Sequence, residues 1–446
     1  MAIHLDDKLR NVSIVGAAGK MGRGISLLLA QEMALLKWKN PDKSYVLNLI
    51  DPSEAGLEGL WAYIRSQVSG YAEKNITLLR NLAKDRSHLV ENTDIITEFV
   101  TVVLSLMRLS SVVESASKSS LVFEAALEKE EFKVELFKKL KNLCSEETFF
   151  FTNTSSLPIG ILDSGASLQG RLIGYHFYNP PAIQKLIEII PSDSTKQELQ
   201  DIALELAKRL KKTVVSSRDV AGFIGNGHFI RDGIYAFSEV SKLQSEYGFP
   251  GAVYIINKIT QDFLVRPMGI FQLIDYVGID VFYCIQKVMS KFLHQDLYHP
   301  IVETMIKLNV LGGQNSDSSQ KNGFLLYEKN KPSGIFDPAT SQYKRFSDGN
   351  WTQELDTKMG NMPAGWASWK ALSSDPGKEP KLAQYFQNLS QANSPGSVLA
   401  RAYMASSKAI AEKLVNDGVA NCAEDVNCVL ITGFYHLYGA VHNYYR

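Results

Sequence analysis

The stretch Asn-Val-Ser-Ile-Val-Gly-Ala-Ala-Gly-Lys-Met-Gly-Arg-Gly, residues 11–24, decides the fold of this chain of 446 residues. Residues 11–15 are mostly β-branched, the glycines follow, and the apolar run 25–36 is typical of a helix. Strand, glycine turn and helix in this order predict a dinucleotide-binding unit, because glycines let backbone N–H groups approach a pyrophosphate at the helix start. We therefore expect an N-terminal α/β domain of the Rossmann type.

An acidic residue follows the next expected strand. Residues 45–50 read as that strand, and it ends at Asp51. A carboxylate there accepts from the adenosine ribose and repels a 2′-phosphate, which favours NAD over NADP. The glycines are spaced GxxGxxG rather than GxGxxG, and Asp51 arrives late, so we interpret Lys37–Lys43 as an inserted loop. Arg23 beside the turn keeps NADP open as an alternative.

Polar residues follow a further expected strand. Residues 121–126 and 148–151 read as buried strands, and 130–142 have the apolar spacing of an amphipathic helix. The second strand runs into Thr152–Ser156, and ligands bind at the carboxyl ends of parallel strands. The alternative is that these side chains only cap the turn and the next helix.

A histidine lies between aromatic residues in the stretch Gly174–Pro180, and a carboxylate lies inside an apolar run twelve residues after it. These residues are His176 and Glu188. An imidazole oriented by a partly buried carboxylate is suited to take a proton from a hydroxyl at neutral pH. The alternative is a structural core histidine with a satisfied partner.

Composition excludes several classes of protein. Lysine plus arginine and aspartate plus glutamate both number 47, so nothing points to nucleic acid as the main partner. The four cysteines show no metal-ligand spacing and read as reduced thiols, and no metal site is expected. The start of the chain does not read as a signal peptide, and the apolar segment 95–109 is too short to span a membrane. We expect a soluble, cytoplasmic protein.

Taken together, these motifs resemble the L-3-hydroxyacyl-CoA dehydrogenase family, and in particular the dehydrogenase part of multifunctional fatty-acid β-oxidation proteins. The resemblance covers residues 10–345 and, more weakly, 396–446. It rests on the glycine turn, Asp51, Val122–Ala125, Asn153–Ser156, His176–Pro180, Glu188 and Asp219–Asn226, in that order.

The resemblance implies NAD-dependent oxidation of an L-3-hydroxyacyl-CoA to a 3-oxoacyl-CoA. His176 is then the general base, Glu188 orients it, and Ser155 and Asn226 bind the substrate. The implied cofactor-binding residues are Gly16, Gly19, Met21, Gly22, Asp51, Glu128, Lys133, Asn153 and Asn179. Lys74 falls where the family places a basic contact to coenzyme A, although a surface lysine is usually no more than that.

Beyond residue 216 the pattern becomes helical, so an all-α region with two related helical units is expected after the α/β domain. The expected domains are 1–215, which binds NAD; 216–345, a first helical unit; 346–395, an inserted linker; and 396–446, a second, degenerate helical copy. Asn226 is followed by Gly227 and His228, where the family usually has arginine after the asparagine. Two copies in one chain can imitate a dimer interface, so both a monomer and a homodimer are expected possibilities, and a hydratase or thiolase is a possible partner.

Two other functions stay open at this point. The chain can be a dehydrogenase of a free 3-hydroxy acid, or an inactive nucleotide-binding partner subunit. The altered glycine spacing and Gly227 favour the inactive alternative, whereas the presence of His176, Glu188, Ser155 and Asn226 together opposes it.

Overall fold

The computed structural model describes residues 5–315 and 318–444 and divides into two compact units, Met1–Asp219 and Val220–Arg446. Each unit has a hydrophobic core of its own. The outermost residues of the expected first and last domains, 1–4 and 445–446, lie outside the described part. Within the described ranges, no helix combines the length and the apolar character that crossing a membrane requires.

The first unit is built on an eight-stranded sheet with strand order β3-β2-β1-β4-β5-β6-β7-β8. Six strands run parallel, β7 pairs antiparallel with β6, and β8 runs parallel to β7. The strands are β1 (Asn11–Val15), β2 (Val46–Ile50), β3 (Met107–Ser110), β4 (Leu121–Glu124), β5 (Phe149–Thr152), β6 (Leu172–Phe177), β7 (Leu186–Ile190) and β8 (Thr213–Ser216).

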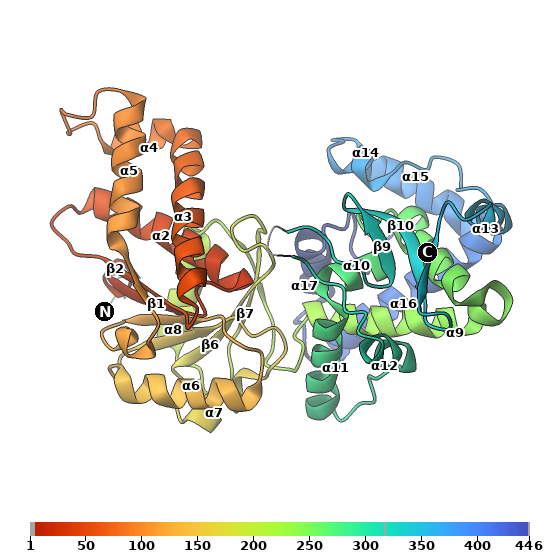
Figure 1. Ribbon diagram of the computed structural model, residues 1–446, viewed down its shortest axis with the longest axis horizontal. Coiled ribbons are helices and arrows are strands. Elements are labelled where there is room, and N and C mark those ends of the chain that lie inside the picture. Colours follow the sequence, from red (N-terminus) through yellow and green to blue (C-terminus); the bar gives the residue numbers. More distant parts are fainter. Residues whose placement is uncertain (1–4, 316–317, 445–446) are drawn as a thin grey trace. The chain divides into compact units, whose positions relative to one another are not determined.

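Helices cover both faces of this sheet, as Figure 1 shows for α3, α4 and α5 on one side and α6 and α7 on the other. Side chains alternate along each strand, so Leu121 and Phe123 of β4 join the core beneath α2, α3, α5 and α8. The helices are α1 (Leu5–Lys8), α2 (Lys20–Lys39), α3 (Glu54–Lys74), α4 (Ile76–Leu82), α5 (Asn92–Leu106), η1 (Val113–Ala116), α6 (Glu130–Leu143), α7 (Ile159–Ala166) and α8 (Gln197–Arg209).

The second unit is mainly helical. Its long helix α9 (Gly225–Lys258) bends at Gly248, which has a φ of 69° and precedes Pro250 by two residues. The elements after α9 are η2 (Ile259–Phe263), α10 (Ile270–Val277), α11 (Ile279–Leu293), α12 (Pro300–Lys307), β9 (Leu325–Glu328), β10 (Lys331–Asp337), β11 (Gln342–Arg345), α13 (Trp351–Met359), α14 (Trp369–Ser373), α15 (Lys378–Gln391), α16 (Pro395–Asn416), α17 (Ala423–Cys428) and η3 (Val429–Gly433).

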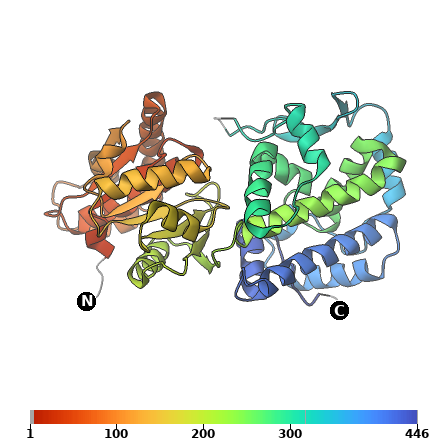
Figure 2. The same ribbon diagram turned by 90° about the horizontal axis from the view of Figure 1, so that it is seen from below.

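A backbone pattern recurs within the second unit at a spacing of 170 residues. The helices α9 and α16 begin at Gly225 and Pro395, and both η2 and η3 are short π-helices. Asn257 Oδ1 accepts from the Phe271 N–H at 3.1 Å, and Asn427 Oδ1 accepts from the Val441 N–H at 3.0 Å. The helices α9 and α16 pack against each other, which places the two occurrences of the pattern side by side (Figure 2).

The predicted class, a Rossmann-type α/β unit followed by a helical region, is confirmed, but the expectation of an all-α second region needs one correction. β9, β10 and β11 form a three-stranded antiparallel sheet, because Lys329 and Asn330 take positive φ in a tight turn and Ile335 and Phe336 bury their side chains in the core. A second correction concerns the expected inserted loop at residues 37–43. The helix α2 continues through Lys39, so within this range residues 40–43 alone lie in the loop before β2.

The segment 346–395, expected as an inserted linker, contains α13, α14 and α15, all of which contribute to the core of the second unit.

Candidate functional site

His176 and Glu188 lie directly opposite each other on two paired strands. Their Cα atoms are register partners in the antiparallel pair of β6 and β7. His176 Nδ1 is 2.9 Å from Glu188 Oε2, and the side chain of Glu188 is fully buried. The His176 side chain is 10% exposed, so it is mostly buried and keeps a small area in contact with solvent. The pair therefore has the geometry of a base and its orienting carboxylate.

Tyr178 is a third member of this cluster. Its hydroxyl donates to the same Glu188 Oε2 at 2.9 Å, and its ring centroid lies 4.9 Å from that of His176. Burial, and then the adjacent negative charge of Glu188, raise the pKa of Tyr178 well above its usual value. Tyr178 therefore stays a neutral donor and helps to fix the carboxylate that faces the imidazole.

The turn between β6 and β7 is held from two sides. Lys212 Nζ donates to the carbonyl oxygens of Pro181 at 2.5 Å and of Gln184 at 2.7 Å, and burial lowers the pKa of Lys212 to about 8. A Cβ at Gly24 of α2 would come within 2.8 Å of the Pro181 ring, so α2 approaches this turn closely. The helix that follows the glycine turn thus packs against the turn that follows His176.

The residues of the glycine turn fit a bound dinucleotide. Gly16 has a φ of 81°, and a Cβ there would lie 2.6 Å from the Ala125 carbonyl oxygen; a Cβ at Gly22 would lie 1.9 Å from the Gly16 carbonyl oxygen. Only glycine permits such close approaches of backbone to backbone. Asp51 follows β2 directly, and its Oδ2 accepts from the Ala18 N–H at 3.1 Å, so the carboxylate lies beside the turn. This is where an acidic residue meets the adenosine ribose in this type of fold.

The positions of the other expected cofactor residues in the glycine turn also suit a bound dinucleotide. Gly19 is the N-cap of α2, with Met21 in the first turn of that helix, and backbone N–H groups at a helix start favour a pyrophosphate. The Arg23 guanidinium lies over the ring of Tyr63, at 5.7 Å from its centroid.

Glu128 organises the loop that carries Ser155. Its Oε1 accepts from Thr154 Oγ1 at 2.6 Å, from the Ser155 N–H at 2.9 Å and from Ser156 Oγ at 3.2 Å. Burial favours a higher pKa, but the positive charge of Lys133 and these hydrogen bonds outweigh it and lower the pKa of Glu128. Glu128 is therefore a carboxylate at neutral pH, and it fixes residues 154–156 at the end of β5.

Lys133 is buried between two carboxylates. The residue is 1% exposed, and its Nζ lies 2.6 Å from Glu124 Oε1 and 3.3 Å from Glu128 Oε2. Burial alone would lower the pKa of Lys133, but Glu124 and Glu128 outweigh burial and raise it. Its charged group thus faces protein carboxylates on two sides.

The other expected site residues are placed as follows. Asn153 Oδ1 accepts from the Phe177 N–H at 2.9 Å, so Asn153 joins the end of β5 to the strand of His176. Asn179 follows β6 and precedes Pro180 through a cis peptide bond. Lys74 is exposed at the last residue of α3, where a cation is also favourable to the helix dipole. Asn226 belongs to the second unit, in the first turn of α9.

Gly227 and His228, which depart from the family pattern, face α16. A Cβ at Gly227 would lie 2.9 Å from Leu414, and His228 Nε2 lies 3.1 Å from Ser407 Oγ. A side chain at position 227 would therefore require the Leu414 side chain of α16 to shift. Glycine at position 227 thus suits the close packing of α9 against α16.

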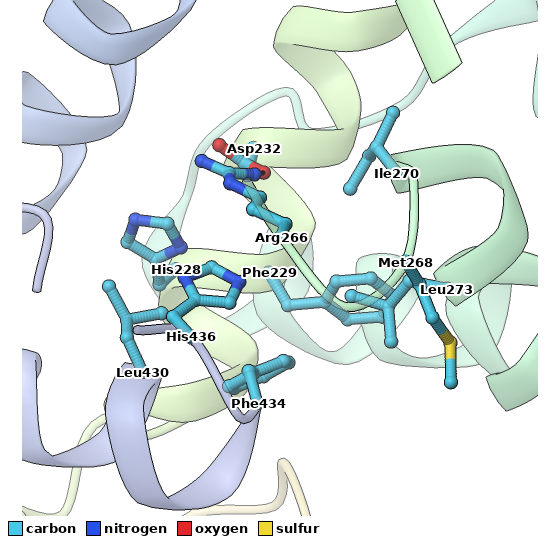
Figure 3. A pocket seen from close by; sticks show the side chains of 10 residues that line it. All are labelled: His228, Phe229, Asp232, Arg266, Met268, Ile270, Leu273, Leu430, Phe434 and His436. Atoms are coloured by element: carbon cyan, nitrogen blue, oxygen red, sulfur yellow. Dashed lines mark hydrogen bonds and ion pairs between the residues drawn. The ribbon is translucent and has the colours of Figure 1, made fainter. Parts of the chain in front are cut away.

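A small cavity in the second unit has a polar wall (Figure 3). Its volume is about 20 Å³, which suits about one water molecule and no cofactor. His228, Asp232, Arg266 and His436 line it, and Arg266 Nη1 donates to Asp232 Oδ2 at 2.9 Å. Asp232 Oδ1 and Arg266 Nε are buried without a hydrogen-bond partner among the residues described. Since Tyr403 of α16 donates to the carbonyl oxygen of Asp232 at 3.0 Å, this cluster joins α9 to α16.

Sequence reasoning assigned no role to Tyr178 or Glu124. Tyr178 belongs to the same His-Phe-Tyr-Asn-Pro block as His176, and Glu124 is a charged residue that ends an otherwise apolar strand. A charge in such a position is the signal by which Glu124 is recognisable, because a fully buried carboxylate requires a partner.

An α/β unit with a glycine turn that suits a dinucleotide and a buried histidine–carboxylate pair is compatible with a dehydrogenase-type oxidoreductase. The family model described as "3-hydroxyacyl-CoA dehydrogenase, NAD binding domain" matches residues 11–220, and "3-hydroxyacyl-CoA dehydrogenase, C-terminal domain" matches residues 232–321. The 3-hydroxybutyryl-CoA dehydrogenase of Clostridioides difficile is 30% identical over 274 residues, which cover 60% of this chain and 90% of that protein. The chain belongs to the 3-hydroxyacyl-CoA dehydrogenase family, whose members are NAD-dependent oxidoreductases.

Two further relatives show how far the similarity extends. The human protein named "Hydroxyacyl-coenzyme A dehydrogenase, mitochondrial" is 29% identical over 328 residues, covering 72% of this chain and 92% of that one. The crystal structure of 3-hydroxybutyryl-CoA dehydrogenase from Escherichia coli K12 has a TM-score of 0.63 at 21% identity and covers 97% of this chain and 90% of that chain. The likeness in fold to the E. coli protein thus includes the C-terminal helices beyond the two family models.

Proposed function

We propose that this protein oxidises the 3-hydroxyl of an L-3-hydroxyacyl-CoA to give a 3-oxoacyl-CoA. His176 takes the hydroxyl proton at Nε2 and becomes an imidazolium. Glu188 accepts the hydrogen bond from Nδ1 and balances the new positive charge, as a buried carboxylate does for a catalytic histidine. NAD, when bound, accepts the hydride from the substrate carbon.

The observation that carries this proposal is the buried pair of His176 and Glu188, with 2.9 Å between Nδ1 and Oε2. The antiparallel register of β6 and β7 sets this distance, so the imidazole is oriented before any ligand arrives. A rigid base needs little reorganisation when the proton moves.

Ser155 and Asn226 are the proposed contacts to the substrate oxygens. The backbone N–H of Ser155 is fixed on Glu128, which supports a well-defined position for its hydroxyl. Asn226 lies at the start of α9 in the second unit. Both side chains carry hydrogen-bond donors that suit a substrate oxygen.

For the substrate, we propose an acyl-CoA of short chain, because relatives such as the C. difficile protein are named 3-hydroxybutyryl-CoA dehydrogenases. Lys74 is a proposed contact to a phosphate of coenzyme A, and its exposure at the end of α3 is compatible with that contact. For the cofactor we propose a preference for NAD over NADP, supported by the position of Asp51 beside the glycine turn.

We also propose a domain organisation in which residues 1–215 bind NAD and 216–345 and 396–446 are two copies of one helical unit. The backbone pattern that recurs at 170 residues and the packing of α9 on α16 support this division. We propose that the protein is a monomer, because the second copy covers α9 within the same chain. The alternatives are a homodimer and a complex with a hydratase or thiolase. Size-exclusion chromatography distinguishes these three outcomes.

The cytoplasm is the proposed location. Cys144, Cys284, Cys422 and Cys428 are reduced thiols, which suit a reducing compartment. Some relatives are named mitochondrial, as the human protein is, so fractionation of cells that express the full chain tests the location.

NADH oxidation with acetoacetyl-CoA, run beside the variant His176→Ala and repeated with NADPH, tests the proposal. Turnover by the parent and a loss of ~10²- to ~10⁴-fold in the variant is the expected result for a general base. A variant that keeps the parent rate would refute the role of His176. Turnover of free 3-hydroxybutyrate but not of the CoA ester would instead favour the free-acid dehydrogenase, and absence of NADH binding in the folded protein would favour an inactive subunit.

A further inference from the structure

Glu124 is a fully buried carboxylate that has no step in the proposed reaction. It ends β4, and Lys133 Nζ donates to its Oε1 at 2.6 Å and to its Oε2 at 2.7 Å. The Ala126 N–H donates to Oε1 at 2.7 Å, and Thr152 Oγ1 donates to Oε2 at 2.6 Å. Both oxygens are thus engaged, and the partners come from three segments, the residues after β4, α6 and the end of β5.

Two paths connect Glu124 to the loop of Ser155. The first passes through Lys133, whose Nζ also lies 3.3 Å from Glu128 Oε2; Glu128 Oε1 in turn accepts from Thr154 and Ser155. The second passes through Thr152, whose Oγ1 also accepts from the Thr154 N–H at 3.3 Å. A change at Glu124 therefore reaches both the carboxylate and the backbone that set this loop.

The charge arrangement explains why Glu124 is needed. Lys133 lies between two carboxylates, and its bonds to Glu124 are shorter than its contact with Glu128. Without the charge on Glu124, the buried ammonium of Lys133 keeps Glu128 as its partner and competes with Thr154, Ser155 and Ser156 for that carboxylate. Short charge-assisted hydrogen bonds have strict geometry, so such competition displaces the loop.

We propose that Glu124 is a positioning residue that, through Lys133 and Thr152, fixes Glu128 and the loop 153–156 in the geometry required for the reaction. Lys133, at 1% exposure, is the link that joins Glu124 to Glu128. The catalytic role of Ser155 in this inference rests on the proposed function.

A purely structural role is the competing explanation. A buried ion pair can serve only to satisfy two charges, and removal of one partner destabilises a protein because the other is left unpaired. Removal of both Glu124 and Lys133 leaves no unpaired ammonium, and the remaining carboxylate, Glu128, is 29% exposed and keeps contact with solvent. The double variant Glu124→Gln/Lys133→Met therefore separates the two explanations, because it restores charge balance without restoring the link to Glu128.

The experiment compares the parent chain with Glu124→Gln, Lys133→Met and the double variant. Thr152→Val removes the second path while all charges stay in place, and it provides a folded test protein if a single charge variant fails to fold. Asp163→Asn is the matched control, since Asp163 is also a buried carboxylate that accepts from a backbone N–H, that of Gly170 at 3.1 Å. Each protein is measured for Tm, NADH affinity by fluorescence titration, amide hydrogen exchange of residues 153–157, and kcat and KM with acetoacetyl-CoA.

If Glu124 is a positioning residue, the Tm of the double variant should be higher than that of either single variant. Its kcat should stay ~10- to ~100-fold below that of the parent, which is the effect expected of a displacement of about 1 Å. Exchange of the Ser155 amide rises in all variants except Asp163→Asn, which lowers Tm and leaves kcat unchanged. Recovery of kcat together with Tm in the double variant, or unchanged exchange of the loop, overturns the inference. Absence of turnover by the parent itself counts against the proposed function alone, because loop exchange and NADH affinity still decide the positioning role.

Discussion

Replacement of Glu188 by glutamine removes the charge opposite His176 and keeps the size of the side chain. In the structure one oxygen, Oε2, is 2.9 Å from His176 Nδ1 and 2.9 Å from the Tyr178 hydroxyl. A hydrogen bond to a charged partner contributes ~1.5–3 kcal/mol, and the imidazolium formed in the reaction is the state that loses it. At roughly 1.4 kcal/mol per tenfold change in rate, Glu188→Gln should lower kcat by ~10- to ~150-fold.

The assay is steady-state NADH oxidation with acetoacetyl-CoA for the parent, Glu188→Gln, His176→Ala and the double variant. Because the two residues act as one unit, we expect the double variant to be no slower than His176→Ala alone. Glu205→Gln, which changes an exposed carboxylate on α8, is the control and should keep the parent rate. An equal loss from Glu188→Gln in the parent and in the His176→Ala background would refute the reasoning, since Glu188 would then act independently of the imidazole.

Three further predictions concern the cofactor turn and the second unit. Asp51→Ser should raise the KM for NADH by about tenfold or more and lower the KM for NADPH, because repulsion of a 2′-phosphate is removed; unchanged cofactor preference would contradict the role of Asp51. Gly22→Ala should lower the free energy of unfolding by ~2 kcal/mol, since its Cβ would lie 1.9 Å from the Gly16 carbonyl oxygen, whereas Gly59→Ala, which meets no atom within 4 Å, should be neutral or stabilising in the same urea titration. Burial, and then the positive charge of Arg266, lower the pKa of His228, while Asp232 opposes this, so the unfolded chain binds a proton that the folded chain does not. Stability should therefore fall below about pH 6.5, by up to roughly 1.4 kcal/mol per pH unit for this group, and His228→Gln should reduce that slope in urea titrations at pH 7.5, 6.5 and 5.5.

Local patterns predict the start of the first unit well, because the strand, the glycine turn and the helix that form it follow one another in the chain. Residues 11–24 contain strand, turn and helix in sequence, and the close approach of Gly22 to Gly16 lies within that segment. Asp51 directly follows the strand that pairs with β1, so its place beside the turn follows from the parallel order of the strands.

Only part of the candidate site can be predicted from the sequence. The spacing of His176 and Glu188 in the sequence does not predict that their strands pair antiparallel with these two residues opposite each other. That pairing depends on the turn between the strands, which Lys212 and α2 at Gly24 contact. Glu124 and Thr152 are 28 residues apart and meet because β4 and β5 are neighbours in the sheet. Contacts such as that of Tyr403 with Asp232, 171 residues apart, depend on helix packing that no local pattern encodes.

The backbone pattern that recurs at a spacing of 170 residues affects which substitutions each helical segment tolerates. In a symmetric dimer each substitution appears on both sides of the interface, so both sides must tolerate it. Here position 226 carries asparagine and its counterpart, position 396, carries a glycine, where a Cβ would lie 2.5 Å from the ring of Phe263. A gene that encodes both helical segments in one chain can keep asparagine in one, for the substrate contact that we propose, and a glycine that fits the packing in the other.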